Sequence, residues 1–79
     1  MTARIYVTLK SSVLDPQGQA VARALGRLGF GEVTDARIGK YITLVLAGDR
    51  ADAAARVEAM CRELLANPVM EEYRFELED

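Results

Sequence analysis

Few residues in this chain of 79 could carry out chemistry. It has no histidine, which removes the commonest general base and the commonest metal ligand. Its one cysteine, Cys61, falls on an apolar helical stripe, whereas a reactive thiolate needs a partly exposed, electropositive setting. Glu71 and Glu72 are neighbours in a strand pattern, so they point to opposite faces and cannot form a catalytic pair. These residue types leave almost nothing that could run an enzyme unaided.

Two other positions allow a chemical and a structural interpretation. Asp15 could act as a base, but Asp followed by Pro16 is a typical helix start, in which the carboxylate accepts unpaired backbone N–H groups. The pair Gly39-Lys40 resembles the end of a phosphate-binding loop. It lacks the preceding glycine and the following helix, so a turn is the better interpretation.

The composition indicates one small globular domain, residues 1–79. The chain is 51% hydrophobic and 28% charged with a net charge of −2, which excludes disorder, and it has no basic block for nucleic acid. It has no apolar run near the ~20 residues that span a bilayer, and no signal peptide, so we expect the cytoplasm. A domain of this size buries only about 60–65% of its unfolded surface, which favours a partner chain.

The hydrophobic periodicity predicts strands and helices in the order β-α-β-β-α-β. This order is typical of an α+β, two-layer ferredoxin-like sandwich, in which a four-stranded sheet carries both helices on one face. A hairpin at Gly39-Lys40 should join the second and third strands. The second helix should be capped by Asp49 and should bury Ala53, Val57, Met60, Cys61, Leu64 and Leu65. The expected elements are strands 3–10, 33–38, 41–47 and 69–77, and helices 16–28 and 49–67.

The other sheet face should be open and adhesive, because it mixes aromatic, β-branched and charged side chains. The two edge strands should also carry unpaired backbone groups. We therefore predict a homodimer, formed by strand pairing or by packing of sheet faces, with a tetramer as an open alternative. The predicted open face comprises Arg4, Tyr6, Thr8, Tyr41, Thr43, Val45 and Arg74.

Several segments together resemble one known family, the small PurS-type subunits of phosphoribosylformylglycinamidine (FGAM) synthase. The resemblance covers essentially the whole chain, in the right order. Its most specific segments are Leu-Asp-Pro-Gln-Gly at 14–18 and Asn-Pro-Val at 67–69. The other matching segments are Leu9-Lys10, Ala24-Leu25, Leu28-Gly29, residues 37–40, residues 64–66, Glu71 and Tyr73.

The resemblance implies a role in the fourth step of purine biosynthesis. The family's complex converts formylglycinamide ribonucleotide (FGAR), glutamine and ATP into FGAM, glutamate, ADP and phosphate. A glutaminase subunit releases ammonia, and a large synthetase subunit, which binds ATP and Mg, uses it. The small subunit is implied to be a cytoplasmic, non-catalytic bridge between the two, with no cofactor or metal of its own.

The candidate subunit-contact residues are those that the family motif shares and that the fold does not obviously need. They form three groups: one at the start of the first helix, one at the expected hairpin and one after the second helix. Each group also has a structural interpretation, as a helix cap, a turn and a helix end respectively. The candidates are Leu14, Asp15, Pro16, Gly18, Arg37, Gly39, Lys40, Asn67, Pro68, Glu71 and Tyr73.

The main alternative is a free-standing ACT-like regulatory module that binds a small metabolite between two ferredoxin-like protomers. Such modules often have a Gly-rich loop after the first strand, where this chain has Ser11-Ser12. A copper carrier or an acylphosphatase would need Cys-x-x-Cys or a Gly-rich loop with arginine in that place. RNA binding would need basic surroundings for Tyr6 and Tyr41.

Overall fold

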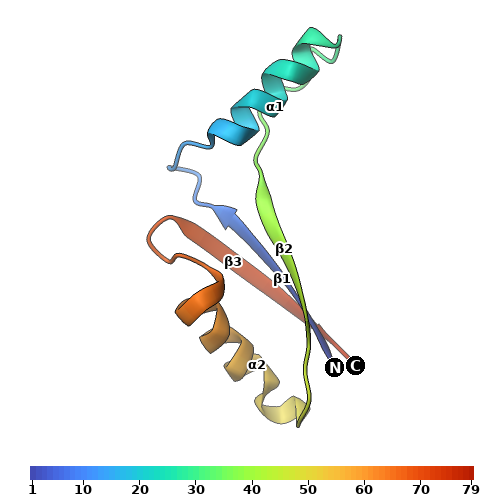
Figure 1. The fold of residues 1–79 in the computed structure, drawn as a ribbon, viewed down its shortest axis with the longest axis vertical. Coiled ribbons are helices and arrows are strands. Elements are labelled where there is room, and N and C mark those ends of the chain that lie inside the picture. Colours follow the sequence, from blue (N-terminus) through green and yellow to red (C-terminus); the bar gives the residue numbers. More distant parts are fainter.

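The computed structural model describes all residues, 1–79, and contains three strands and two long helices (Figure 1). A π-helical turn, η1, continues the second helix. No helix is long and apolar enough to cross a membrane. The elements in chain order are β1 (Thr2–Leu9), α1 (Pro16–Arg27), β2 (Gly39–Val45), α2 (Arg50–Met60), η1 (Cys61–Leu65) and β3 (Glu71–Glu78).

The three strands form one antiparallel sheet in the order β2-β1-β3, so β2 and β3 are its two edges. Ile5 at the centre of β1 lies opposite Ile42 of β2 and Phe75 of β3. The alternating apolar residues of β1, Ala3, Ile5 and Val7, are fully buried, as strand periodicity predicts. The central strand therefore supplies half of a small core.

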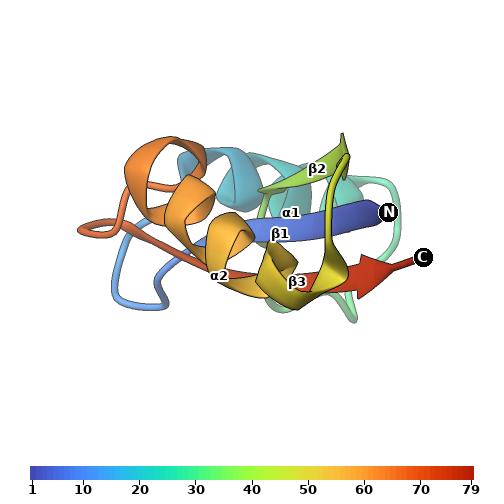
Figure 2. The same cartoon turned by 90° about the horizontal axis from the view of Figure 1, so that it is seen from below.

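Helix α2 covers one face of this sheet (Figure 2). It begins as predicted at Asp49, whose Oδ1 accepts a hydrogen bond from Ala51 N at 3.0 Å. Val57 and Cys61 of its buried stripe are fully enclosed against β1. The prediction that Leu64 belongs to this stripe is wrong, since its side chain is 83% exposed. The π-helical turn η1 adds a residue per turn there and rotates Leu64 away from the sheet.

Helix α1 begins where predicted and ends one residue earlier than predicted, with Leu28 as its C-cap. Asp15 is its N-cap and Pro16 its first residue. At its end, Gly29 adopts φ of 103°, Gly29 N donates to Gly26 O, and Phe30 N donates to Leu25 O. This is the hydrogen-bond pattern of a Schellman motif. The local signals for this helix therefore determine its length to within one residue.

The position of α1 differs from the prediction. The helix extends beyond one end of the sheet instead of covering it, so only α2 lies on the sheet face (Figure 1). The expected strand at residues 33–38 is absent, and the expected hairpin at Gly39-Lys40 is where β2 begins. The sheet accordingly has three strands and not four, and the single chain is not a complete ferredoxin-like sandwich.

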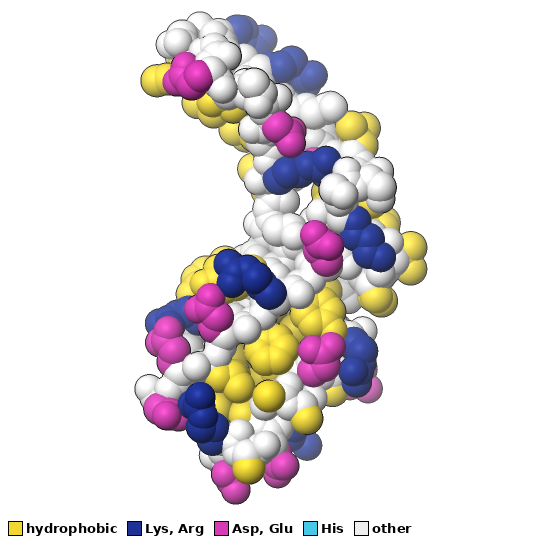
Figure 3. Space-filling view, turned by 180° about the vertical axis from the view of Figure 1, so that it is seen from behind, with side chains coloured by type: hydrophobic (Ala, Val, Ile, Leu, Met, Phe, Trp, Pro, Cys, Tyr) yellow, Lys and Arg dark blue, Asp and Glu magenta, His cyan; other side chains and the backbone are white.

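The fourth strand is missing because residues 33–38 contact helix α1 and not the sheet. Instead of joining the edge of β2, they run beside α1, where Ala36 packs on Gly18 and Ile38 donates to Asp15. We call α1 together with residues 28–38 the arm, and the sheet with α2 and η1 the sheet lobe. The molecule is consequently elongated, 49 × 26 × 14 Å, with a narrow waist between arm and sheet lobe (Figure 3).

Candidate subunit-contact site

The three groups of candidate residues, far apart in sequence, meet where the arm joins the sheet lobe. One open groove of about 540 Å³ lies at this junction. It takes Asp15 and Pro16 from the first group, Gly39 and Lys40 from the second, and Glu71 from the third. The groove therefore turns three separate sequence motifs into one continuous surface.

Asp15 organises the groove. Its side chain is 5% exposed. Oδ1 accepts from Gly18 N at 2.9 Å, and Oδ2 accepts from Ile38 N at 2.7 Å. The N–H groups of Gly18 and Ile38 hold the pKa of Asp15 below its ordinary value, with a smaller contribution from the charge of Arg37. Asp15 is thus fully engaged as an acceptor, so its structural interpretation as a cap is confirmed and extended.

Arg37 holds the loop between β1 and α1. Its Nη1 donates to Val13 O at 2.6 Å and its Nη2 to Ser11 O at 3.2 Å. Its Nε lies 3.9 Å from Asp35 Oδ2 in an exposed ion pair, which contributes little. Arg37 accordingly has a positioning task in this chain in addition to any contact with a partner.

Two glycines allow the backbone segments of the junction to approach each other. A Cβ at Gly18 would collide with the carbonyl oxygen of Ala36, a backbone atom. A Cβ at Gly39 would lie 2.6 Å from Val7 O. Because the neighbouring atoms belong to the backbone, neither site can make room by moving a side chain. At Gly18 the approaching backbone is that of Ala36 in the same chain.

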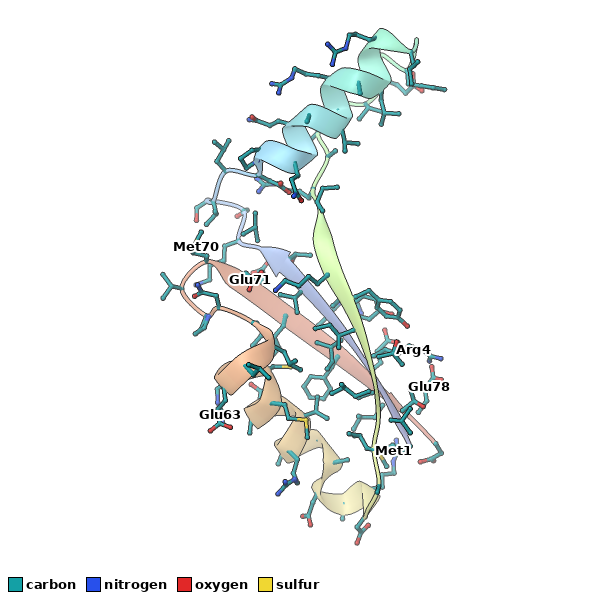
Figure 4. The ribbon with its side chains drawn as sticks, viewed as in Figure 1. Met1, Arg4, Glu63, Met70, Glu71 and Glu78 are labelled. Carbon is teal, nitrogen blue, oxygen red and sulfur yellow. The ribbon has the colours of Figure 1, made fainter.

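Lys40 and Glu71 close the groove on the β3 side. Lys40 Nζ lies 3.8 Å from Glu71 Oε2, and Glu71 Oε1 accepts from Asn67 N at 2.7 Å. Figure 4 shows Glu71 at the start of β3, beside the turn that contains Met70. Asn67 Oδ1 in turn accepts from Val69 N at 3.0 Å, which stabilises that turn. Asn67 thus shapes the turn beside the groove.

The remaining candidates lie outside the groove. The side chain of Leu14 is exposed, and Pro68 lies in the exposed turn before β3. The hydroxyl of Tyr73 donates to Glu58 Oε1 on α2. That hydrogen bond raises the pKa of Tyr73, and burial raises it further. Four groove residues were not predicted, although Leu9 continues the inward alternation of β1: Val7, Leu9, Gln17 and Ile38.

The open face of the sheet is a second surface and matches its prediction. The rings of Tyr6 and Tyr41 lie 5.1 Å apart, and the Arg74 guanidinium stands 4.0 Å above the Tyr6 ring. Arg4 pairs with Glu78 at the far end of the sheet (Figure 4). These contacts order an exposed surface that mixes aromatic and charged groups.

The groove and the open face carry groups that could contact another protein. No group of three or more His, Cys, Asp or Glu residues is placed to hold a metal ion. Cys61 is fully buried, and burial raises the pKa of its thiol. The thiol therefore stays protonated at neutral pH and is a poor nucleophile. The groove and the open face combine hydrogen-bonding and apolar groups with no nucleophile beside a base.

Comparisons with known proteins show the family of this chain. Residues 2–79 match the family model described as "PurS: Phosphoribosylformylglycinamidine (FGAM) synthase". The PurS subunit of FGAM synthase from Bacillus subtilis is 50% identical over 76 residues, which cover 96% of this chain and 90% of the relative. A solved structure of B. subtilis PurS matches with a TM-score of 0.90 and 49% identity, covering 99% of this chain and 98% of that one.

A second solved structure places a similar chain in a larger assembly. It is the PurLQS complex from Thermotoga maritima, in which the matching chain is 38% identical with a TM-score of 0.84. The match covers 95% of this chain and 93% of that one. None of these similarities favours the ACT-like alternative. The chain belongs to the PurS family, the small subunits of phosphoribosylformylglycinamidine synthase, a ligase of purine biosynthesis.

Proposed function

We propose that this chain is a non-catalytic bridge within FGAM synthase. In this role it brings the glutaminase and the ATP-dependent synthetase together, so that ammonia released from glutamine reaches FGAR. The observation that carries the proposal is the convergence of three family motifs on one open junction groove. The similarity to a chain of the T. maritima PurLQS complex supports an assembly of this kind.

The chemistry of ammonia explains why such a bridge is useful. Free ammonia in water is protonated and lost by diffusion, so the two active sites must be joined and shielded from solvent. A bridging subunit needs surfaces that fit other proteins and needs no nucleophile. ATP and Mg are then bound by the large subunit, and this chain holds no cofactor. In this role the chain works in the cytoplasm.

The surface area supports a homodimer. The chain exposes 5632 Å², whereas a compact monomer of its mass exposes about 4,700 Å². The excess of roughly 900 Å² is close to the ~800 Å² that each partner buries in a standard interface. It arises from the arm, where Val21, Leu28 and Phe30 are all exposed. A second copy that covers the arm would bring the exposed area to an ordinary value.

Co-purification tests the bridge. The tagged chain is mixed with the glutaminase and the synthetase, with glutamine and ATP present, and captured. We expect all three proteins to be recovered together, and the two larger proteins to associate less when the chain is omitted. Equal association of the two larger proteins without the chain would overturn the bridging role.

A further inference from the structure

Helix α1 is a basic helix in an acidic chain. The chain carries ten basic and twelve acidic residues, which give a net charge of −2. Helix α1 contains no Asp or Glu, and its only charged residues are Arg23 and Arg27. The rest of the chain therefore carries a net charge of −4, against +2 for the helix. Charge is thus segregated between α1 and the remainder of the molecule.

Arg23 and Arg27 have no ion-pair partner within the chain. Six of the ten basic residues form an ion pair, and none of these six lies in α1. The two arginines are four positions apart and both exposed, so they lie beside each other on the helix surface, where like charges destabilise a helix. The last turn of a helix favours a cation, which accounts for Arg27 but not for Arg23. The pair therefore has no structural task that explains it.

The two arginines lie on a side of α1 that the rest of the arm leaves open. Gly18 is buried and marks the inner side of the helix. Arg23 and Arg27 lie about 140° and about 180° around the helix from Gly18. The exposed apolar residues Val21 and Leu28 lie on a third side, about 60–80° from Gly18. A second copy that covers Val21 and Leu28 would therefore leave both arginines accessible. Basic side chains line this outer edge of the arm (Figure 3).

We propose that Arg23 and Arg27 bind an acidic surface of the glutaminase subunit. The proposal rests on the bridging role proposed above and names one of its contacts. The planar guanidinium group of arginine can donate two parallel hydrogen bonds to one carboxylate. Two such groups about 6 Å apart along a helix fit two carboxylates that lie one helical turn apart on the partner. The unpaired charges of α1 would be neutralised in that contact.

The chemistry of the two partners favours the glutaminase over the synthetase. In the proposed complex the synthetase binds ATP and FGAR, which both carry phosphate. Positive potential around such a site attracts these anions, and the same potential repels a basic helix. Glutamine carries no net charge, so a glutaminase has no need of a positive field for its substrate. Charge complementarity therefore assigns α1 to the glutaminase and the acidic remainder of the chain to the synthetase.

Removal of the two charges tests the proposal on the full chain. The test variant is Arg23→Ala with Arg27→Ala, and alanine is the best helix former, so α1 should remain intact. The matched control is Arg50→Ala with Arg62→Ala, which lowers the net charge by the same amount at two exposed arginines that already have partners, Asp79 and Glu58. Each protein is titrated into the glutaminase and, separately, into the synthetase, with glutamine and ATP present.

We expect the Arg23, Arg27 variant to bind the glutaminase about fivefold or more weakly than the control does, and to bind the synthetase as the control does. Raising the salt from about 0.05 M to about 0.5 M should weaken glutaminase binding by the unmodified chain much more than binding by the variant. Native mass spectrometry should show the same oligomeric state for all three proteins.

Equal affinity of variant and control for the glutaminase would overturn the proposal, and a loss confined to the synthetase would overturn the choice of partner. A changed oligomeric state would place the arginines between copies of this chain and also overturn it. An unmodified chain that binds neither partner alone would overturn this contact, while co-purification of all three proteins judges the bridge separately.

Discussion

Asp15 Oδ2 accepts a hydrogen bond from Ile38 N at 2.7 Å, across 23 positions of sequence. The same carboxylate caps α1 through Gly18 N. One side chain thereby ties the start of α1 to the residue that precedes β2, and so fixes the arm against the sheet lobe. The junction groove depends on this connection.

Replacing Asp15 with Asn should lower stability at neutral pH. The amide keeps one acceptor but presents an N–H group to one of the two backbone donors. Because the folded-state pKa of Asp15 is lowered, its contribution is present above about pH 4 and is lost as the pH falls through the folded pKa. Urea denaturation at pH 7 and pH 3 should show a difference between the two proteins that shrinks at the lower pH.

Asp35→Asn is the control for this measurement. Asp35 is exposed and has only a 3.9 Å ion pair with Arg37. The urea midpoint of the Asp35→Asn protein should therefore equal that of the unmodified chain at both pH values. If Asp15→Asn and Asp35→Asn behave alike, the connection through Asp15 does not hold the arm.

Gly18→Ala and Gly26→Ala should change stability in opposite directions. Both glycines lie within α1, but only Gly18 faces a backbone oxygen. The collision with Ala36 should cost roughly 1–3 kcal/mol. At Gly26 the added methyl group meets nothing within 4 Å, so alanine should stabilise the helix by about 0.5–1 kcal/mol.

Thermal unfolding at one fixed protein concentration compares the two glycine variants. For a domain of this size each kcal/mol shifts the melting temperature by about 4–8 °C. A Gly18→Ala protein as stable as the original would show that Ala36 does not pack on α1 in solution.

The double variant Arg37→Ala, Lys40→Ala should fold and yet assemble poorly. Both side chains are exposed. Lys40 makes a 3.8 Å ion pair with Glu71, and Arg37 donates to Val13 O and Ser11 O in the loop between β1 and α1. These contacts hold a loop and no helix or strand, so the secondary structure should survive their loss. Far-UV circular dichroism should be unchanged, while glutamine-dependent turnover of the reconstituted complex should fall roughly fivefold or more, which corresponds to about 1 kcal/mol. Arg50→Ala with Arg62→Ala, two exposed arginines on α2 and η1, serves as the control. Turnover at the normal rate in the Arg37, Lys40 variant would remove these residues from the contact site.

Local features were predictable from sequence, whereas long-range placement was not. The cap at Asp15, the end of α1 near residue 28 and the strand at β1 depend on neighbouring residues, and all three agree with the prediction to within one or two residues. The missing fourth strand depends on a choice between two partners for residues 33–38. Their alternation suits a sheet edge, but in the single chain Asp15 and Gly18 hold them against α1. The widening of the helix at Cys61–Leu65 likewise has no periodic signature.

In the candidate site, too, the local features were predictable and the long-range placement was not. The motif residues were identified from sequence, but their meeting in one groove needs the fold, because residues near 15, 40 and 71 belong to three different elements. Arg37 was predicted as a contact residue, and its hydrogen bonds to Ser11 and Val13 depend on a loop conformation that no local pattern indicates.

Turnover with two nitrogen donors tests the central proposal most directly. Glutaminase and synthetase are assayed for FGAM formation, with and without this chain, once with glutamine and once with ammonia. The bridging role predicts that glutamine-driven synthesis needs the chain and that ammonia-driven synthesis proceeds without it. Equal rates from glutamine in the presence and absence of the chain would contradict the account.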